Sequence, residues 1–373
     1  MKLTNKKIAI IGGGPGGLTL ARLLQLDGAT VHVYERDKSR NVRVQGSTLD
    51  LHEDSGLKAL EKAGLMEAFK QNYRPGAELM RIVNPQCQII YDQHQEKTNQ
   101  VFGDAWFRPE IDRGPLRDIL LDALTPDTVI WNSHIEDLET LDADIIIGAD
   151  GANSRLRKFV TTATPVYSGI MVIEGTVYDA AKNAPRLHAL TKGGKVFALG
   201  DSKTLITSAK GDGSLSFYTG FRKVESWSKT SGLDFSDHRQ LLDWFSEEYK
   251  GWDKIWSELF LDDHTSFIPR PQYYMPFDQT WEPHKNITLI GDAAHVMPPY
   301  AGEGVNMAML DALELSECLT NAAWPDLNTA IATYEHIMLK RAAQTARMTL
   351  EQTEILHAPG ALKHLLQLLE IPQ

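Results

Sequence analysis

The sequence predicts an α/β fold: a Rossmann-like dinucleotide-binding domain, assembled from separated stretches of chain, into which a mostly antiparallel β-sheet is inserted. Three observations lead to this prediction. A strand, a glycine-rich turn, a helix and a second strand that ends in an acid follow one another within residues 7–35. Two apolar strands, 145–147 and 287–290, come far later, and each leads to an aspartate. Short alternating segments over 166–221 are typical of antiparallel strands.

The first of these units has the features of a nucleotide site. In the glycine turn, Gly12 permits a tight bend, Gly14 lets the backbone approach a pyrophosphate, and Gly17 lets the next helix pack close to the strand. The amides at the start of that helix favour a negative charge. Glu35 is placed to accept hydrogen bonds from both hydroxyls of a ribose. Glycines also serve ordinary tight turns, but the flanking strand and helix and the distance to the acid favour a dinucleotide.

The other elements follow from hydrophobic periodicity and from turn residues. Strands are expected at 31–35, 77–83, 88–91, 128–131, 144–148, 172–178, 195–199, 205–208, 215–221 and 287–291. Helices are expected at 18–27, 56–63, 116–124, 238–249, 254–261, 305–319 and 328–356, with a last one after Gly360. The nucleotide domain should therefore comprise residues 1–75, 101–165 and 272–320, the inserted domain 76–100 and 166–271, and a C-terminal helical segment 321–373.

The composition of the 373 residues limits the partners of the protein. A net charge of −11 argues against a nucleic acid or an anionic membrane as the main partner. Cys87 and Cys318 lie far apart and form no disulfide framework or CxxC pair, which fits a cytoplasmic protein. No apolar run approaches the length of a membrane-spanning helix. The twelve histidines fall at no metal-ligand spacing, so no metal is expected.

Two later turns carry candidate ligand contacts, because Asp150 and Asp292 each follow an apolar strand. Each aspartate could be no more than a helix N-cap. Three strand ends of this kind in one chain, with a proline- and glycine-rich loop after the last, favour a ligand instead. Asp292 would then bind a polyol, and the amides from Gly302 through Gly304 to Asn306 could hold the anionic edge of a ring.

Together these motifs resemble those of the group A flavoprotein monooxygenases, which have the p-hydroxybenzoate-hydroxylase-like fold. The resemblance covers nearly the whole chain, through the glycine turn with Glu35, the Asp150 turn and the Gly291-Asp292 turn in this order. The chain is more closely similar to the TetX-type tetracycline-inactivating monooxygenases. That similarity is carried by the segments 33–37, 46–52, 109–113, 127–131 and 291–299.

The resemblance implies a set of FAD contacts. Arg36 would lie beside the adenine, Asp50, Arg113 and Asp292 would contact FAD, and Arg43 would meet NADPH. The chemistry agrees, because an arginine offers a planar pair of donors to a phosphate or a polarised oxygen. Arg113 could also be an ordinary exposed residue at a helix start, and Arg43 could belong to a solvated basic face. Since the chain has one glycine turn of this kind, the nicotinamide would bind transiently.

The activity that the resemblance implies is that of an FAD-dependent monooxygenase that uses NADPH and O2. In such enzymes a flavin C4a-hydroperoxide carries the chemistry, so no catalytic side chain is expected. The implied substrate is a tetracycline-type polyketide, which hydroxylation would inactivate, and the enzyme is expected to be a monomer. Two alternatives stay open: a hydroxylase of another phenolic or polyketide substrate, and a flavin-binding protein or reductase that inserts no oxygen. The helix 328–356 would bridge the two domains, or pack simply as core.

The inserted sheet should form the substrate wall, and here the chain departs from the TetX-type pattern. Where that family presents Gln, Arg, His and Gly to the antibiotic, this sequence has Glu174, Lys195, Ser216 and Tyr218, and Tyr300 replaces a Phe near the flavin. Lysine cannot reproduce the bidentate contact of an arginine. These side chains could also be mere sheet packing. We therefore expect the five residues to contact the substrate, and tetracycline hydroxylation to be weaker or broader than in the family.

Overall fold

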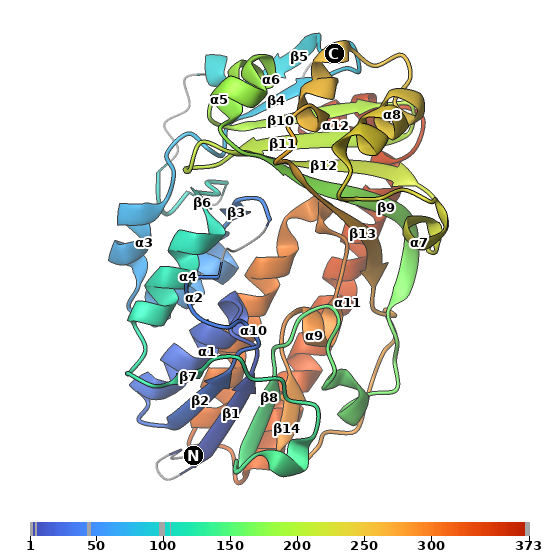
Figure 1. Ribbon diagram of the computed structural model, residues 1–373. Coiled ribbons are helices and arrows are strands. Elements are labelled where there is room, and N and C mark those ends of the chain that lie inside the picture. Colours follow the sequence, from blue (N-terminus) through green and yellow to red (C-terminus); the bar gives the residue numbers. More distant parts are fainter. Residues whose placement is uncertain (1–2, 4–5, 43–45, 97–100, 105, 370–373) are drawn as a thin grey trace.

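Two β-sheets organise the molecule, one above the other in the view of Figure 1. The computed structural model describes residues 3, 6–42, 46–96, 101–104 and 106–369. Within these residues, the lower sheet is parallel, in the order β14 (Ile287–Leu289), β8 (Ile145–Gly148), β1 (Lys7–Ile11), β2 (Thr30–Tyr34) and β7 (Val129–Ile130). The upper sheet has the order β13 (Ser266–Tyr274), β9 (Val166–Val177), β12 (Leu215–Arg222), β11 (Lys203–Ala209), β10 (Lys195–Gly200), β4 (Met80–Val83) and β5 (Ile89–Asp92).

The upper sheet is antiparallel except where β10 pairs with β4. A two-stranded ribbon of β3 (Leu49–Asp50) and β6 (Glu110–Ile111) lies between the lower helices and the upper sheet (Figure 1). The predicted α/β fold with an inserted, mostly antiparallel sheet is therefore confirmed.

Helices cover both sheets. The α-helices are α1 (Pro15–Leu26), α2 (Lys58–Lys62), α3 (Met66–Asn72), α4 (Arg113–Asp122), α5 (Ala180–Asn183), α6 (Pro185–Thr191), α7 (Trp227–Thr230), α8 (His238–Glu248), α9 (Asp292–His295), α10 (Glu303–Thr320), α11 (Leu327–Leu356) and α12 (Ala361–Leu368). A π-helical segment, η1 (Glu53–Leu57), precedes α2. The 3₁₀ helices are η2 (Gln93–Gln95), η3 (Leu138–Thr140), η4 (Arg157–Phe159), η5 (Lys254–Phe260) and η6 (Pro299–Ala301).

The carboxyl ends of the parallel strands point toward the upper sheet (Figure 1). Backbone hydrogen bonds hold these ends side by side: Ala149 N donates to Ile11 O at 2.8 Å, and Ile290 N donates to Gly148 O at 2.9 Å. In parallel α/β sheets this edge is where ligands bind. The glycine turn and both aspartate turns therefore meet at one edge, although they come from distant parts of the sequence.

The upper sheet has one covered face and one face turned toward the lower domain. Phe217 and Phe221 of β12 pack with α8 and η5 in a buried apolar cluster. Successive residues of a strand point to opposite faces. Ser216, Tyr218 and Gly220 of the same strand therefore lie on the face that looks toward the lower domain.

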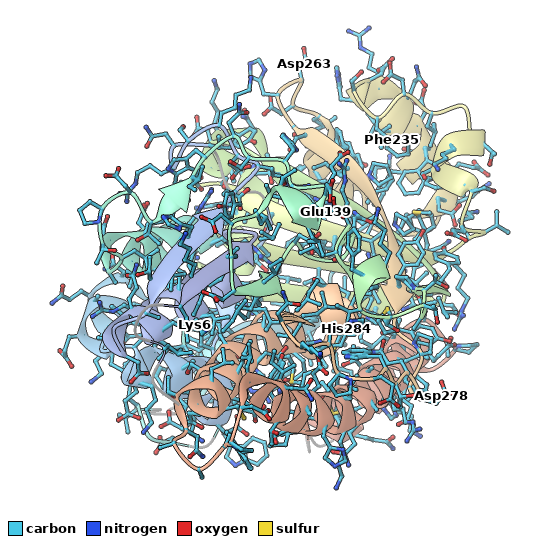
Figure 2. All side chains as sticks on the ribbon, turned by 90° about the horizontal axis from the view of Figure 1, so that it is seen from below. Lys6, Glu139, Phe235, Asp263, Asp278 and His284 are labelled. Atoms are coloured by element: carbon cyan, nitrogen blue, oxygen red, sulfur yellow. The ribbon has the colours of Figure 1, made fainter. Side chains whose placement is uncertain are left out.

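The C-terminal helix α11 contacts both domains. It spans Leu327–Leu356, within one residue of the range that the sequence predicts. Its first half belongs to the core of the lower domain, where Tyr334 is fully buried and donates to a backbone oxygen of β14 at 2.9 Å. Its far end reaches the upper sheet, where Arg222 Nε donates to His357 O at 2.9 Å. Figure 2, seen from below, shows α10 and α11 lying together along one side of the lower sheet.

Several elements differ from the prediction, and two of them lie at the start and end of the segment before the nucleotide domain resumes. Residues 254–261, predicted as an α-helix, form the 3₁₀ helix η5, which at seven residues is longer than most helices of this kind. Strand β13 was not predicted, because Pro269 and Pro271 interrupt its pattern. It is an edge strand paired with β9 on one side, where a proline without an N–H is tolerated. It runs past position 272, where the nucleotide domain was expected to resume.

Candidate functional site

The glycine turn and Glu35 have the geometry expected of a dinucleotide site. Gly12 has a φ of +115°, which a residue with a side chain rarely adopts. A Cβ at Gly17 would lie 2.1 Å from Gly12 O, so only glycine lets α1 pack this close to β1. Around Gly14 the space is open, since a Cβ there would meet no atom within 4 Å. The buried carboxylate of Glu35 accepts from two backbone N–H groups, at 2.6 and 2.9 Å, and is thereby fixed in place.

The two aspartate turns differ in structure. Asp150 caps a turn and not a helix, because its Oδ2 accepts from the backbone N–H groups of Arg155 and Leu156 at 2.7 and 3.3 Å, whereas the next helix, η4, begins only at Arg157. Its other oxygen, Oδ1, is buried and has no hydrogen-bond partner in the structure. Asp292 makes no capping bond at the start of α9, and its Oδ1 lies 3.9 Å from the position of a Cβ at Gly304. Burial raises the pKa of the Asp292 carboxyl, in spite of the nearby His295.

Asp50, Arg113 and the loop before α10 come together beside these turns. A Cβ at Gly302 would lie 3.0 Å from Asp50 Oδ2. Arg113, the first residue of α4, donates from Nε to Ser47 O at 2.9 Å, which orients its guanidinium. The side chain of Asn306 is fully buried and is used within the protein: it donates to Asp50 O at 2.9 Å and to Gly302 O at 3.2 Å. Asn306 therefore joins the two loops, and its side chain is not presented to a ligand.

Four of the expected substrate residues lie on one face of the upper sheet. Tyr218 of β12 stands directly opposite Glu174 of β9. Lys195 of β10 and Ser216 of β12 both pair with the same residue of β11. The Tyr218 hydroxyl accepts from Ser47 N at 2.9 Å, and Ser216 Oγ donates to Ser47 Oγ at 3.0 Å. This face therefore contacts the loop that also positions Arg113.

A buried ion pair joins this face to the ribbon below it. Lys195 pairs with Glu110 of β6, whose side chain is 1% exposed. Burial acts to lower the pKa of Lys195, but the charges of Glu110 and Asp50 outweigh it and the pKa is raised. Burial likewise acts to raise the pKa of Asp50, yet the hydrogen bond with His52 and the charge of Lys195 bring it down to about 2. Lys195 is therefore a permanent cation whose main partner is the protein itself.

A buried network behind the Asp292 turn was not predicted. His295 Nε2 lies 2.6 Å from Asp311 Oδ2, and Gly291 N donates to the same oxygen at 2.8 Å. Arg341 donates to Asp311 Oδ1 at 2.5 Å. A lone aspartate in the apolar run of α10 is a sequence signal for such a network, because a buried charge needs partners. The geometry gives His295 a role in supporting the Gly291-Asp292 turn.

The remaining predicted residues lie at the edges of this arrangement. Glu174 accepts from Arg270 Nε at 3.0 Å. Tyr300, in η6, turns its hydroxyl toward the upper sheet and the end of α11. Arg36 directly follows Glu35 and is exposed. Arg43 lies outside the residues that the structure describes.

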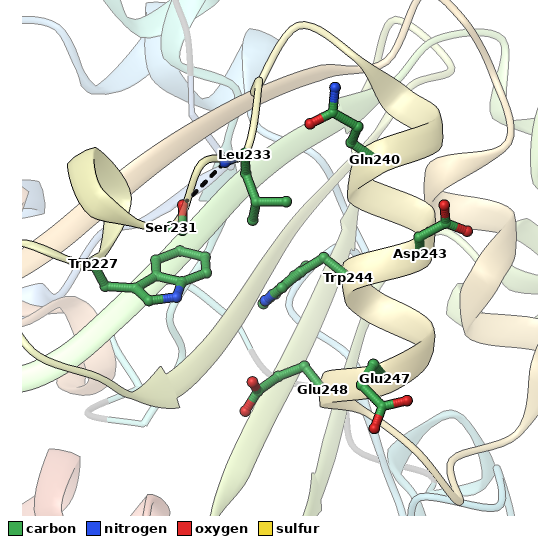
Figure 3. Close-up of a pocket in the computed structure, with 8 residues that line it drawn as sticks. All are labelled: Trp227, Ser231, Leu233, Gln240, Asp243, Trp244, Glu247 and Glu248. Atoms are coloured by element: carbon green, nitrogen blue, oxygen red, sulfur yellow. Dashed lines mark hydrogen bonds between the residues drawn. The ribbon is translucent and has the colours of Figure 1, made fainter.

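A separate pocket of about 480 Å³ lies between α7 and α8, in the layer that covers the other face of the upper sheet (Figure 3). Trp227 and Trp244 form its apolar wall, with ring centres 5.6 Å apart. Glu248 at its edge is already paired with Lys203 and Lys223, at 3.5 and 2.9 Å. Its lining residues, which include no predicted site residue, are Trp227, Ser231, Leu233, Gln240, Asp243, Trp244, Glu247 and Glu248.

The described part of the chain offers few other reactive groups. Burial raises the pKa of Cys87 to about 12 and that of Cys318 to about 11, so neither thiol is a ready nucleophile. No three His, Cys, Asp or Glu among the described residues are grouped to hold a metal ion. No helix in the same residues is long and apolar enough to cross a lipid bilayer.

Comparisons with known proteins agree with this geometry. Residues 5–104 and 279–349 match the family described as "FAD binding domain". The chain is 26% identical to Monooxygenase penA of Penicillium thymicola, over 92% of this chain and 93% of that protein. It is also 26% identical to 6-hydroxynicotinate 3-monooxygenase of Pseudomonas fluorescens, over 93% and 91%. The solved structure of tetracycline destructase Tet(51) matches with a TM-score of 0.71 and 17% identity, over 98% of this chain and 96% of that one, a likeness that shows the fold alone.

The residues at the strand ends fit an FAD. The open space at Gly14 admits a pyrophosphate against the start of α1, and the fixed carboxylate of Glu35 can accept from a ribose. Asp150 Oδ1 is a buried acceptor still in need of a donor. Asp292, the first residue of α9, lies beside the start of α10 and has no capping role. These four residues, with the amides of the 302–306 loop, would hold the cofactor.

The Asp292→Ala variant is expected to bind FAD about 5- to 150-fold more weakly. The carboxylate would be the acceptor for a polar group of the cofactor, and leaving such a group unpaired costs about 1–3 kcal/mol. Titration of the apoprotein with FAD measures the change. Asp278→Ala, which removes an exposed aspartate in the same part of the chain, is the control and should bind FAD normally. Equal affinities of the two variants would remove Asp292 from the cofactor site.

Proposed function

We propose that the chain is an FAD-dependent monooxygenase of the group A family, and that it uses NADPH to hydroxylate a tetracycline-type polyketide. One atom of O2 enters the substrate, the other leaves as water, and NADPH supplies the two electrons. FAD, when bound, supplies the redox and oxygen chemistry. The side chains of this protein then bind, orient and exclude water.

One observation carries the proposal: four of the five expected substrate residues share one face of the upper sheet, and that face meets the Ser47 loop. Tyr218 and Ser216 contact Ser47 directly, and Arg113 donates to the same residue. A substrate held on this face would therefore lie next to the cofactor loops of the lower domain. The segments 46–52 and 109–113, which carry the resemblance to the TetX-type enzymes, contact this face through Ser47 and Glu110 and support the choice of substrate class.

The residues of this face would act by position and charge. Lys195 remains protonated and places a positive field beside the substrate, which favours an enolate or phenolate form. Burial raises the pKa of Tyr218, so its hydroxyl stays neutral while it accepts from Ser47 N. Arg113 is oriented by its bond to Ser47 O and can bind a polarised oxygen of the cofactor.

A second candidate is a hydroxylase of a smaller phenolic or heteroaromatic substrate. The observation that favours it is the pairing of the polar side chains: Lys195 with Glu110, Glu174 with Arg270, and Tyr218 with Ser47. Fewer free hydrogen-bonding groups remain for the polar edge of a tetracycline. The similarity to a 6-hydroxynicotinate 3-monooxygenase is in keeping with this alternative.

The two candidates are separated by mass spectrometry of the products. The holoenzyme is incubated with NADPH and either tetracycline or a panel of phenols that includes 6-hydroxynicotinate. We expect tetracycline to gain one oxygen atom, in step with NADPH oxidation. Oxygen gain by a phenol but not by tetracycline supports the second candidate. NADPH oxidation that yields hydrogen peroxide and no product with any compound contradicts both.

If Arg43 binds NADPH, its removal should impair the reduction of the enzyme by NADPH and no other step. Arg43→Ala should raise the KM for NADPH about 10- to 100-fold, since a charge-assisted contact contributes about 1.5–3 kcal/mol. Reaction with O2 after reduction by dithionite should be unchanged. Arg40→Ala is the matched control, because Arg40 pairs with Asp118 and Asp122 at 3.0 and 2.9 Å on α4. An unaltered KM for NADPH in Arg43→Ala would place Arg43 on a solvated face.

A further inference from the structure

Three polar side chains from distant parts of the chain meet where the loop before α10 contacts the upper sheet. The Tyr300 hydroxyl of η6 lies 3.2 Å from His357 Nε2, just after α11, and 3.4 Å from Thr204 Oγ1 of β11. Thr204 Oγ1 is itself 3.3 Å from His357 Nε2. Thr204 and His357 are buried, and the Tyr300 and His357 rings meet edge to face with centres 4.9 Å apart. The cluster thus links the lower domain, the upper sheet and the C-terminal helix.

The upper sheet leaves room for this cluster at Gly220. Gly220 of β12 pairs with Thr204, on the face that also carries Tyr218. A Cβ at Gly220 would lie 2.3 Å from the Tyr300 hydroxyl and 2.5 Å from His357 Nε2. Any side chain at this position would therefore push the three groups apart.

The hydrogen-bond roles in the cluster are fixed by the backbone of α11. His357 Nδ1 lies 2.8 Å from Thr353 O, a carbonyl that can only accept, so Nδ1 carries the proton and Nε2 is the acceptor. Burial lowers the pKa of His357 to about 4, so the ring stays neutral near pH 7. The hydroxyls of Tyr300 and Thr204 are the donors available to it. Tyr300 is thus tied to the end of α11 by a bond that a phenylalanine cannot make.

The position of Tyr300 determines the position of the cofactor loop. Tyr300 lies two residues before Gly302, which is packed against the Asp50 carboxylate. Gly302 O also accepts from the buried Asn306 side chain at 3.2 Å. Movement of the Tyr300 ring would therefore displace the segment whose amides are expected to face FAD.

We propose that Tyr300, His357 and Thr204 are positioning residues that hold the 298–302 loop against the upper sheet, so that FAD affinity depends on the substrate domain and on the end of α11. This inference rests on the FAD-binding part of the proposed function and is independent of the substrate. The Tyr300 hydroxyl, which a phenylalanine lacks, would then couple the two domains through the cofactor loop.

FAD titration of apoprotein tests the proposal without any substrate. Tyr300→Phe should raise the Kd for FAD about 2- to 10-fold, the range expected for one neutral hydrogen bond. His357→Phe, which keeps a ring but removes both nitrogens, should have a similar effect. If the two residues act through one bond, the double variant should resemble the weaker-binding single variant, rather than show the product of both effects. The visible circular dichroism of the bound flavin should change with the loop.

The matched control is Tyr167→Phe, which removes a hydroxyl that donates to Lys223 O at 2.9 Å elsewhere on the upper sheet. It should lower stability to a comparable extent while leaving the Kd for FAD and the flavin spectrum unchanged. The proposal is overturned if Tyr300→Phe binds FAD as tightly as the parent protein, or if the effects of the two single variants multiply. Failure to hydroxylate tetracycline would count against the proposed substrate and would leave this result untouched.

Discussion

Replacing Lys195 by methionine is expected to lower the free energy of unfolding by about 3–5 kcal/mol. The variant keeps most of the side-chain volume but leaves the carboxylate of Glu110 buried without its partner. An unpaired buried charge is much more costly than the loss of an exposed ion pair. Urea unfolding, followed by tryptophan fluorescence, measures the change. Lys7→Met is the control, because Lys7 pairs with Asp142 at the surface and should be nearly neutral.

The defect in Lys195→Met should also depend on pH in a definite direction. Burial already raises the pKa of Glu110 in the folded state, against the charge of Lys195, and the removal of Lys195 raises it further above its value in the unfolded chain. The folded state then binds the extra proton more tightly, so stability rises as pH falls. We expect the deficit to be smaller at pH 5 than at pH 8. The double variant Glu110→Leu with Lys195→Met should recover most of the loss, and a double variant as unstable as the single would contradict this account.

The Asp311→Asn variant is expected to lose about 3–5 kcal/mol of stability and much of its FAD. Asp311 is fully buried and receives contacts from His295, Arg341 and the Gly291 amide. Asparagine has nearly the same shape but leaves His295 without its charged partner and Arg341 with Glu314 alone, so the Gly291-Asp292 turn loses its support. Glu314→Gln is the matched control: Glu314 also pairs with Arg341 but is partly exposed, so its loss should cost much less. Equal losses in the two variants would contradict the assigned role.

The same network predicts a stability plateau in pH. Burial acts to raise the pKa of Asp311, but His295 and Arg341 outweigh it and the pKa is lowered, so this stabilisation is lost as the pH falls below about 4. Burial acts to lower the pKa of His295, but Asp311 outweighs it and the pKa is raised. That stabilisation is complete below about pH 6.5 and is lost as the pH rises through the raised value. In Asp311→Asn, the loss of stability at pH below about 4 and the loss of stability as the pH rises through the raised pKa of His295 should both become smaller.

Much of the fold was predictable because its signals are local. Helix α11 has apolar residues at helical spacing over its first half, an N-cap aspartate that accepts from Thr329 N at 2.8 Å, and a Pro359-Gly360 pair soon after its end. These fix its range to within one residue. Strand β13 lacks such a signal, because its prolines break the pattern and its place at the edge of a sheet is a property of the whole fold. The short helices α5 and α6 were not predicted for a similar reason, since they connect strands and have no periodic apolar face of their own.

The site divides in the same way. The glycine turn, Glu35 and Asp292 are placed by the strands that precede them, so motifs within a few residues suffice to find them. Local motifs do not reveal the partners of Lys195 and Tyr300. Lys195 contacts Glu110, which is 85 positions away in the chain, and Tyr300 contacts His357, which is 57 positions away. Such a distant contact also changes the interpretation of a predicted site residue: Lys195 was expected to bind the substrate, but its main partner is the carboxylate of Glu110.

The interrupted layout of the lower sheet has a consequence for how the protein is made. Strand β1 is the centre of that sheet and leaves the ribosome early, whereas the edge strand β14 begins only at Ile287, and the covering helix α11 later still. At about 5–20 residues per second, the nascent chain exposes this apolar strand for tens of seconds. The upper sheet is complete once Tyr274 has emerged, so it can fold first. The cofactor-binding edge must be the last part to form, and loading with FAD belongs to the end of synthesis or after it.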